Sequence, residues 1–162
     1  MMIISIFNMG IYMLKNVRKY YLSFVPPSKA NRVKINLRAY TKSGKRYIVP
    51  KDVSLKINKA IWELQNQHKG KPISVPVHIK ALFILPNKRR RDLDNIMKTL
   101  GDCLVYAGIL KDDNLIFKQT LEKKIVKDLE GVVIEVSMYD EKELNDKIIT
   151  EIKNYKAGID GI

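Results

Sequence analysis

The sequence predicts an α+β fold, in which a mixed β-sheet of about four strands packs with two main helices and is followed by a C-terminal helix. Two observations support this prediction. Strand-like runs and amphipathic helical runs are interleaved along the chain, without any internal repeat. The 162 residues, of which 46% are hydrophobic, are enough for one domain with its own core. We expect this domain at residues 17–156, after an N-terminal extension at residues 1–16.

Each expected element follows from a local pattern of side chains. Alternating, β-branched or aromatic runs predict strands, and apolar residues at helical spacing predict helices. The expected strands span residues 19–25, 74–85, 114–126 and 132–139, and the expected helices span residues 51–68, 92–106 and 140–155. Because a tight turn at residues 128–131 joins the last two strands, we expect them to form an antiparallel hairpin. Trp62 and Cys103 are expected in the core.

The charge and the cysteine content limit the classes of function. The formal net charge of +13 is typical of a protein that binds a polyanion, with nucleic acid as the first candidate and an anionic membrane surface as the second. The one cysteine excludes an intramolecular disulfide and a cysteine-based zinc site, and it suits a reducing compartment. His68 and His78 are not at motif spacing, so any metal ion is expected to have oxygen ligands.

The start of the chain does not predict a membrane protein. Residues 1–14 are apolar but too short to span a bilayer as a helix. They also lack the basic n-region and the cleavage site of a signal peptide. We interpret them as an extra segment or as the product of an early start codon. We expect a cytoplasmic protein that binds no membrane and takes no small-molecule substrate.

A strongly basic segment lies at residues 26–50, where seven basic residues occur and no acidic one. Strand-like runs at 33–40 and 46–49 predict a basic hairpin or a long loop. Such an arm can contact DNA phosphates, although a solvated surface loop would have the same composition. The candidate DNA-binding residues in this segment are Arg32, Lys34, Lys42, Lys45 and Arg46.

The residues that indicate chemistry are concentrated at 88–113, which read KRRRDLDNIMKTLGDCLVYAGILKDD. Four consecutive cations precede Asp92 and Asp94, at the start of a helix that Asp92 can cap. Two more aspartates follow the helix, just before a strand. Cations beside carboxylates indicate a site that binds a polyanion and holds a metal ion on it. The basic candidates are Lys88, Arg89, Arg90 and Arg91.

These residue types suit hydrolysis of a phosphodiester. A divalent ion held by carboxylates lowers the pKa of bound water and neutralises charge on the reacting phosphate, and Mg²⁺ prefers hard oxygen ligands. Lys98, one turn beyond Asp94, could hold the scissile phosphate, stabilise the leaving oxygen or orient the attacking water. The acids also have a structural interpretation as helix caps and turn residues. Asp94, Lys98 and Asp102 are spaced for i, i+4 ion pairs.

The order Asp92-Leu-Asp94-Asn95-Ile-Met-Lys98, followed by Asp102 and by Gly108-Ile-Leu-Lys-Asp112-Asp113, resembles the signature of the RusA family of Holliday-junction resolvases. The stretch Pro26-Pro27-Ser28, with Asn31 and Arg32 after it, is similar to the N-terminal pattern of that family. The resemblance covers roughly residues 20–139. It implies an α+β homodimer that cleaves four-way DNA junctions symmetrically with Mg²⁺. We expect that Mn²⁺ can take the place of Mg²⁺.

The resemblance also implies a role for each matching residue. The metal-binding acids of the family correspond to Asp92, Asp94 and Asp113, and its essential lysine corresponds to Lys98. These four residues form the expected catalytic set. Supporting roles fall to Asn95, Asp102 and Asp112. The N-terminal extension and the longer C-terminal helix depart from the family pattern.

The sequence therefore predicts a Mg²⁺-dependent endonuclease that resolves four-way or other branched DNA junctions in recombination and repair. Two alternatives stay open. One is a nuclease specific for other branched phage DNA, which a comparison of junction, flap and duplex substrates would separate. The other is a non-catalytic basic DNA-binding protein whose acids are caps and ion pairs; it would bind junctions in EDTA and give no products with Mg²⁺.

Overall fold

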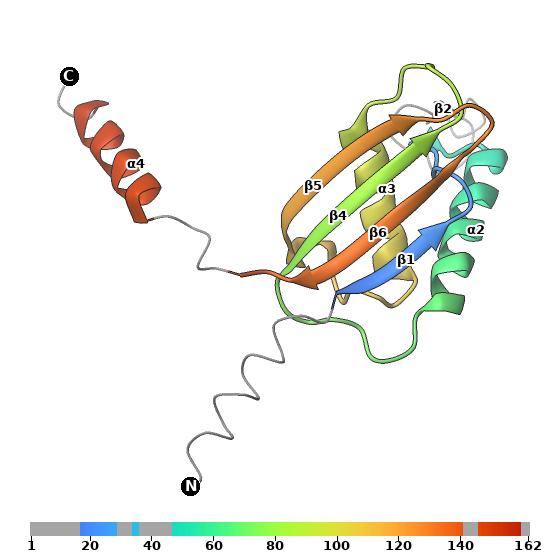
Figure 1. Ribbon diagram of the computed structural model, residues 1–162, viewed down its shortest axis with the longest axis horizontal. Helices are drawn as coiled ribbons and strands as arrows, with labels where there is room; N and C mark the ends of the chain where they lie inside the picture. Colours follow the sequence, from blue (N-terminus) through green and yellow to red (C-terminus); the bar gives the residue numbers. More distant parts are fainter. Residues whose placement is uncertain (1–16, 29–33, 36–46, 141–145, 160–162) are drawn as a thin grey trace, which may run out of the picture.

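The computed structural model describes residues 17–28, 34–35, 47–140 and 146–159, and it confirms the α+β fold. A four-stranded mixed sheet has the order β1 (Arg18–Leu22), β6 (Gly131–Met138), β4 (Val77–Leu85) and β5 (Ile116–Ile125). Two helices, α2 (Lys51–Gln67) and α3 (Leu93–Tyr106), cover one face of this sheet (Figure 1). The remaining elements are the antiparallel pair β2 (Lys34–Ile35) and β3 (Tyr47–Ile48), the 3-10 turn η3 (Asp113–Leu115) and the C-terminal helix α4 (Asp146–Ile159).

Strand β4 occupies the centre of the sheet because it is apolar along almost its whole length. It pairs antiparallel with β6 and parallel with β5. Parallel neighbours need a crossover connection, and α3 is the crossover helix between β4 and β5. Alternate residues of β4 are buried under the helices, namely Val77, Ile79, Ala81, Phe83 and Leu85. The crossover therefore places α3 and the start of β5 next to each other.

The predicted hairpin between the last two strands is wrong, because β4 lies between β5 and β6. The connection at residues 126–130 crosses the end of β4, where the Val126 amide donates to the Leu85 carbonyl oxygen at 3.0 Å. Because β4 separates β5 from β6, the connection must span two inter-strand distances, about 10 Å. Five residues are long enough to do so. Strand β5 carries polar residues on both faces, so the edge of the sheet suits it better than a central place.

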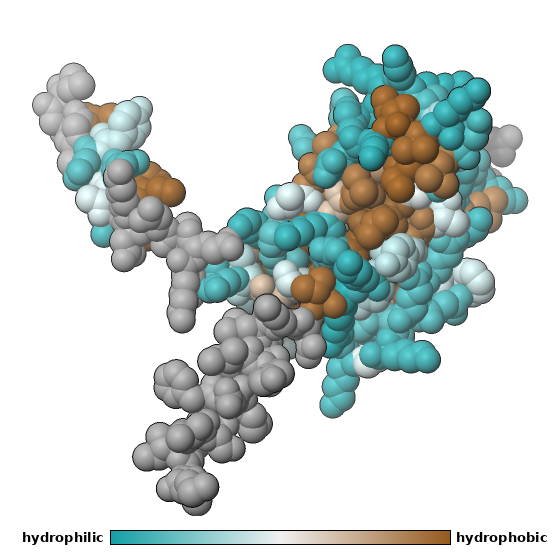
Figure 2. Space-filling view, viewed as in Figure 1, coloured by the Kyte–Doolittle hydropathy of each residue, from teal (hydrophilic) through white to brown (hydrophobic). Residues whose placement is uncertain are grey.

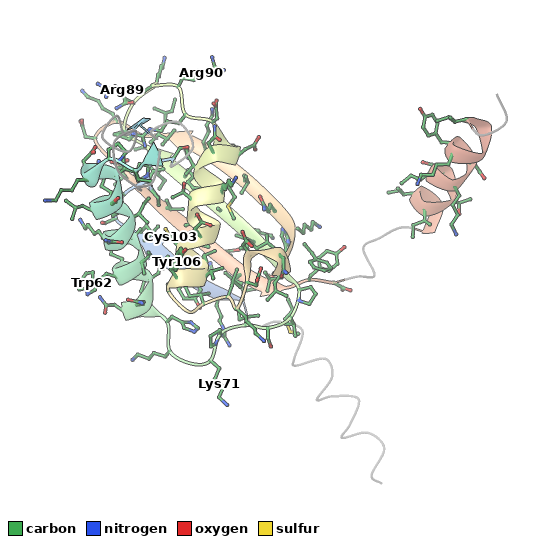
Figure 3. The ribbon with its side chains drawn as sticks, turned by 180° about the vertical axis from the view of Figure 1, so that it is seen from behind. Trp62, Lys71, Arg89, Arg90, Cys103 and Tyr106 are labelled. Carbon is green, nitrogen blue, oxygen red and sulfur yellow. The ribbon has the colours of Figure 1, made fainter. Side chains whose placement is uncertain are left out.

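Helix α2 packs on the sheet through a stripe of buried residues, Val53, Ile57, Ala60 and Leu64. Its end is held to β1, since the hydroxyl of Tyr20 lies 3.0 Å from Nδ1 of His68. The prediction that Trp62 is in the core is wrong, because its side chain is 61% exposed. Two residues beyond Ala60, Trp62 lies about 200° around the helix and faces outward (Figure 3).

Helix α3 forms where the sequence predicts it, directly after Asp92. Its apolar stripe is buried, and the burial of Cys103 confirms that prediction. Gly108 has φ +75°, a left-handed conformation that suits glycine just after a helix. The side of the helix that carries Asp94 and Lys98 stays exposed. The fold therefore leaves one side of α3 open next to β5.

The second face of the sheet is not covered by a helix in the described part of the chain. Leu82, Ile84 and Val133 lie half-buried on this face, where Figure 2 shows an apolar area. Helix α4 is described from Asp146 to Ile159 and lies apart from the sheet in Figure 1, and residues 141–145 of the predicted helix lie outside the described residues. None of the described helices is long and apolar enough to span a bilayer.

Candidate active site

A groove lies between α3 and the edge strand β5. It contains a cavity of about 320 Å³ lined by Asp94, Met97, Lys98, Gly101, Asp113, Ile116 and Gln119. Because α3 is the crossover between two parallel strands, it runs antiparallel to β5, and successive helical turns face successive strand residues. The two elements pack against each other at Gly101, where an added Cβ would lie 3.7 Å from Cδ1 of Ile116. The groove therefore gathers polar side chains from α3, η3 and β5.

The two aspartates before β5, Asp112 and Asp113, make different contacts. Asp112 caps the turn η3, since its Oδ1 accepts a hydrogen bond from the Asn114 amide at 2.9 Å. Asp113, in the first turn of η3, lines the groove with Asp94 and Lys98. Among the described residues no salt bridge joins Asp94 to Lys98, so this part of the i, i+4 interpretation is wrong. Asp102 is half-buried, one turn beyond Lys98.

A second cavity, of about 300 Å³, lies beside the N-terminus of α3. Glu130 connects two segments here, because its Oε1 accepts from the Val25 amide at 3.3 Å and from Nη1 of Arg91 at 3.2 Å. The Pro26-Pro27-Ser28 stretch, the basic run and the connection before β6 therefore meet at this cavity. Its lining consists of Val25, Pro26, Pro27, Ser28, Lys56, Arg90, Arg91, Asp92, Asn95, Ile96 and Glu130.

The basic run forms an exposed loop before α3. Nε of Arg90 lies 3.7 Å from Oδ1 of Asp92, and the Arg90 side chain is 93% exposed. Figure 3 shows Arg89 and Arg90 pointing away from this loop, and Lys88 is also exposed. Arg91 is half-buried because of its contact with Glu130. Exposed cations at one end of the groove can bind DNA phosphates without reading bases.

The predicted basic arm is described only in part. Strands β2 and β3 pair antiparallel, with Lys34 opposite Ile48, as the prediction of a hairpin requires. The other predicted contacts of this arm, Arg32, Lys42, Lys45 and Arg46, lie outside the described residues. Their role in DNA binding stays a prediction.

The carboxylates of the predicted metal site are divided between the two cavities. Asp94 and Asp113 share the groove, whereas Asp92 lines the second cavity with Asn95. Within the described ranges, no three acidic, histidine or cysteine side chains are grouped closely enough to share a metal ion. Two carboxylates in one exposed groove still fit Mg²⁺, which proteins commonly hold by one or two carboxylates while it keeps several waters.

Three residues of this region were not identified from the sequence. Gln119 lines the groove, Glu130 binds Arg91, and Nζ of Lys123 donates to the carbonyl oxygen of Arg91 at 3.4 Å. Gln119 and Lys123 lie on alternate positions of β5, a signal that is visible in the sequence. This pattern points to the active-site groove only when β5 is known to lie beside β4. The predicted hairpin instead paired β5 with β6.

The family model described as Endodeoxyribonuclease RusA matches residues 25–137, which include the lining of both cavities. The chain belongs to the RusA family. Crossover junction endodeoxyribonuclease RusA of Aquifex aeolicus (strain VF5) is 41% identical over 116 residues, which cover 72% of this chain and 87% of the relative. The RusA protein of Enterobacteria phage HK97 is 51% identical over 37 residues, 23% of this chain and 31% of the relative. The RusA protein of Escherichia coli (strain K12) is 38% identical over 55 residues, which cover 34% of this chain and 42% of the relative.

Membership of the RusA family confirms the resemblance found in the sequence, and it confirms the enzyme class, an endodeoxyribonuclease. The match ends at residue 137, so helix α4 is outside it. The α3–β5 groove, with its acids and its lysine, therefore lies within the residues that match the RusA family, whereas the C-terminal helix lies beyond them.

Proposed function

We propose that this protein is a Mg²⁺-dependent endonuclease that resolves four-way DNA junctions in recombination and repair. The observation that carries the proposal is the α3–β5 groove, which brings Asp94, Lys98 and Asp113 together next to the exposed basic loop in a RusA-family chain. Curated RusA relatives are named crossover junction endodeoxyribonucleases, which supports a branched DNA substrate. Mn²⁺ is expected to replace Mg²⁺, because both prefer carboxylate and water ligands.

Hydrolysis adds a water oxygen to phosphorus while the bond to the leaving sugar oxygen breaks and that oxygen takes up a proton. Asp94 and Asp113 would hold the divalent ion, with Asp92 as the third acid of the predicted set. When bound, the ion supplies an acidified water and neutralises charge on the phosphate. Lys98 places a fixed positive charge in the same groove, where it stabilises the negative charge that builds up on the phosphate oxygens.

The basic loop would bind the DNA backbone on the approach to the groove. Its exposed cations, Lys88, Arg89 and Arg90, can contact phosphates in any sequence, so they position the DNA and do not select bases. A chain with a net charge of +13 should also bind DNA with a steep salt dependence. An affinity that stayed the same between low and high salt would contradict this part of the proposal.

We propose a homodimer, because resolution of a four-way junction requires two strands to be nicked. A closed two-fold dimer presents two copies of one site to two symmetry-related strands. Light scattering of the full chain, alone and with a synthetic junction, tests this proposal. A single copy of the chain on each junction, together with full cleavage activity, would contradict the dimer.

The decisive experiment measures cleavage and binding of a synthetic four-way junction by wild type, Asp94→Asn and Asp113→Asn. A flap and a linear duplex are the comparison substrates, and Glu122→Gln, on the opposite face of β5, is the charge control. We expect wild type and control to cut the junction with Mg²⁺, and both site variants to bind without cutting. Binding without cleavage by wild type would instead support a non-catalytic DNA-binding protein.

The role of Asp92 is tested separately, because it lines a different cavity. Binding of Mn²⁺ in the absence of DNA, followed by electron paramagnetic resonance, compares Asp92→Asn with Asp94→Asn and Asp113→Asn. Weaker Mn²⁺ binding in all three variants is the expected result. Unchanged Mn²⁺ binding in Asp92→Asn alone would remove Asp92 from the ligand set.

A further inference from the structure

Strand β5 presents a lysine to the candidate active site from outside the motif. In register with β4, Lys123 lies beside the buried Phe83, and Lys124 lies beside Ile84 on the opposite face. Because neighbouring residues of a strand point to opposite faces, Lys123 is on the side of the sheet covered by the helices, and Lys124 is not. These adjacent lysines therefore have the same charge and different surroundings.

The position of Lys123 is defined by its contact with the loop before α3. Its Nζ donates to the carbonyl oxygen of Arg91, the residue directly before Asp92. Gln119, on the same face of β5, lines the groove with Asp94 and Lys98. Four residues of a strand span about 13 Å. Lys123 thus lies at the end of the α3–β5 groove where the basic loop begins.

The ammonium group of Lys123 has donors that the protein does not use. A lysine carries three N–H donors, and the contact with Arg91 takes one of them at a long distance of 3.4 Å. The side chain is exposed, so the remaining donors face solvent. A DNA strand that lies along the groove would bring its phosphates to these donors.

We propose that Lys123 is a DNA-binding residue of the active-site groove, which contacts a phosphate flanking the one that is cut. This proposal rests on the proposed action on DNA. Because Lys123 lies about 13 Å along β5 from Gln119, which lines the groove, it would meet a different phosphate from the one held beside the acids. Lys123 therefore strengthens substrate binding and takes no part in breaking the bond.

Lys123 also has an alternative role that involves no DNA. Lysines on an edge strand prevent that strand from pairing with strands of other molecules. Lys118 and Lys124 serve that purpose equally well from the opposite face. What distinguishes Lys123 is its place beside Arg91 and the groove. A comparison of Lys123 with Lys124 separates a general effect of edge charge from a specific phosphate contact.

The experiment compares wild type, Lys123→Gln, Lys123→Arg and Lys124→Gln. Binding to a fluorescent four-way junction is measured by anisotropy in EDTA, so that no cutting occurs, from 50 to 200 mM salt. Loss of one phosphate contact should reduce the slope of log affinity against log salt by about 0.9, which makes the loss of affinity over this range about 3–4-fold smaller. We expect this change in Lys123→Gln only, together with weaker binding at 50 mM salt.

Equal slopes in Lys123→Gln and Lys124→Gln would overturn the proposal, and so would failure of Lys123→Arg to keep the wild-type slope. Single-turnover cleavage with Mg²⁺ gives the second measurement. Lys123→Gln should require more protein for half-maximal rate and keep the rate at saturation, since a flanking contact contributes uniform binding. If wild type binds but does not cleave, the proposed nuclease function fails, while the slopes still test Lys123.

Discussion

At the residue scale, two glycines have opposite packing environments. In α3, a Cβ added at Gly101 would lie 3.7 Å from the flexible end of Ile116, an ordinary contact distance. At the start of β6, a Cβ added at Gly131 would lie 2.9 Å from the backbone oxygen of Leu22, which the sheet holds in place. Packing therefore requires glycine at 131 and not at 101.

We expect Gly131→Ala to lower the free energy of unfolding by about 1–3 kcal/mol, because the added methyl group forces β1 and β6 apart. Gly101→Ala should raise it by about 0.5–1 kcal/mol, since alanine favours a helix interior more than glycine does. Denaturation by urea at neutral pH measures both changes. Equal effects of the two substitutions would contradict the difference in packing.

A second feature at the residue scale is the ion pair between β1 and β6. Nζ of Lys19 lies 2.9 Å from Oε1 of Glu135. The hydrogen bond from Lys19, with its charge, lowers the pKa of Glu135 below 4.5. Any stability from this lowered pKa is present above pH 4.5 and is lost as the pH falls through the folded-state pKa. Since the pair is exposed, its contribution to stability is small.

Replacing Lys19 by methionine should raise the pKa of Glu135 toward its ordinary value, because the hydrogen bond and the charge are both removed. A titration followed by NMR of the glutamate side chains measures the change. Glu122, on the same face of the sheet, is the internal control. An unchanged pKa of Glu135 in Lys19→Met would show that the pair does not persist in solution.

At the scale of elements, polar contacts join the end of α2 to the outer strand β1. Tyr20 is 3% exposed, and its hydroxyl meets Nδ1 of His68, the residue after the helix. Gln67 accepts from the Tyr21 amide at 2.8 Å and donates to the Tyr21 carbonyl oxygen at 2.7 Å. These bonds fix the end of α2 against β1, which pairs only with β6 among the described strands.

We expect Tyr20→Phe to lower the free energy of unfolding by about 1–3 kcal/mol, because the substitution leaves a half-buried ring nitrogen of His68 without its partner. Tyr21→Phe is the matched control, since Tyr21 is 55% exposed and uses its backbone for the contact with α2. Thermal denaturation of both variants provides the measurement. A loss of stability in Tyr21→Phe as large as that in Tyr20→Phe would contradict this account.

At the scale of the whole molecule, the RusA domain and helix α4 differ in how they bury apolar surface. The domain core is closed by α2 and α3 over one face of the sheet. Helix α4 carries Ile148, Ile152 and Tyr155 at helical spacing, and they are 50%, 52% and 71% exposed. The buried core contains no residue of α4 among those the structure describes.

A chain that ends at Asp140 should therefore unfold at the same temperature as the full chain, because it keeps every residue of the described core. Differential scanning calorimetry compares the two chains, and junction cleavage shows whether the site is intact. A clear fall in the unfolding temperature at low protein concentration would show that α4 packs on its own domain. A fall that depends on protein concentration would point to contacts between copies.

The candidate catalytic residues could be picked out of the sequence because most of them lie close together along the chain, and their roles stay a prediction. Asp92, Asp94 and Lys98 lie within two turns of one helix, and Asp113 follows the same crossover connection. Helical periodicity alone separates the buried side of α3 from the side with Asp94 and Lys98. The prediction for Trp62 was wrong because its angular position, away from the buried stripe of α2, leaves its side chain exposed.

The sequence by itself determined the interleaved strands and helices, the start of α3 directly after Asp92 and the clustering of acidic and basic residues around that start, because each depends on neighbours within a few positions. Only the tertiary structure decided that β4 separates β5 from β6. The same arrangement puts Gln119 in the groove and brings Lys123 and Glu130 into contact with Arg91. Strand order depends on which apolar strand gains most by lying in the centre. That is a competition among distant segments, which no local pattern records.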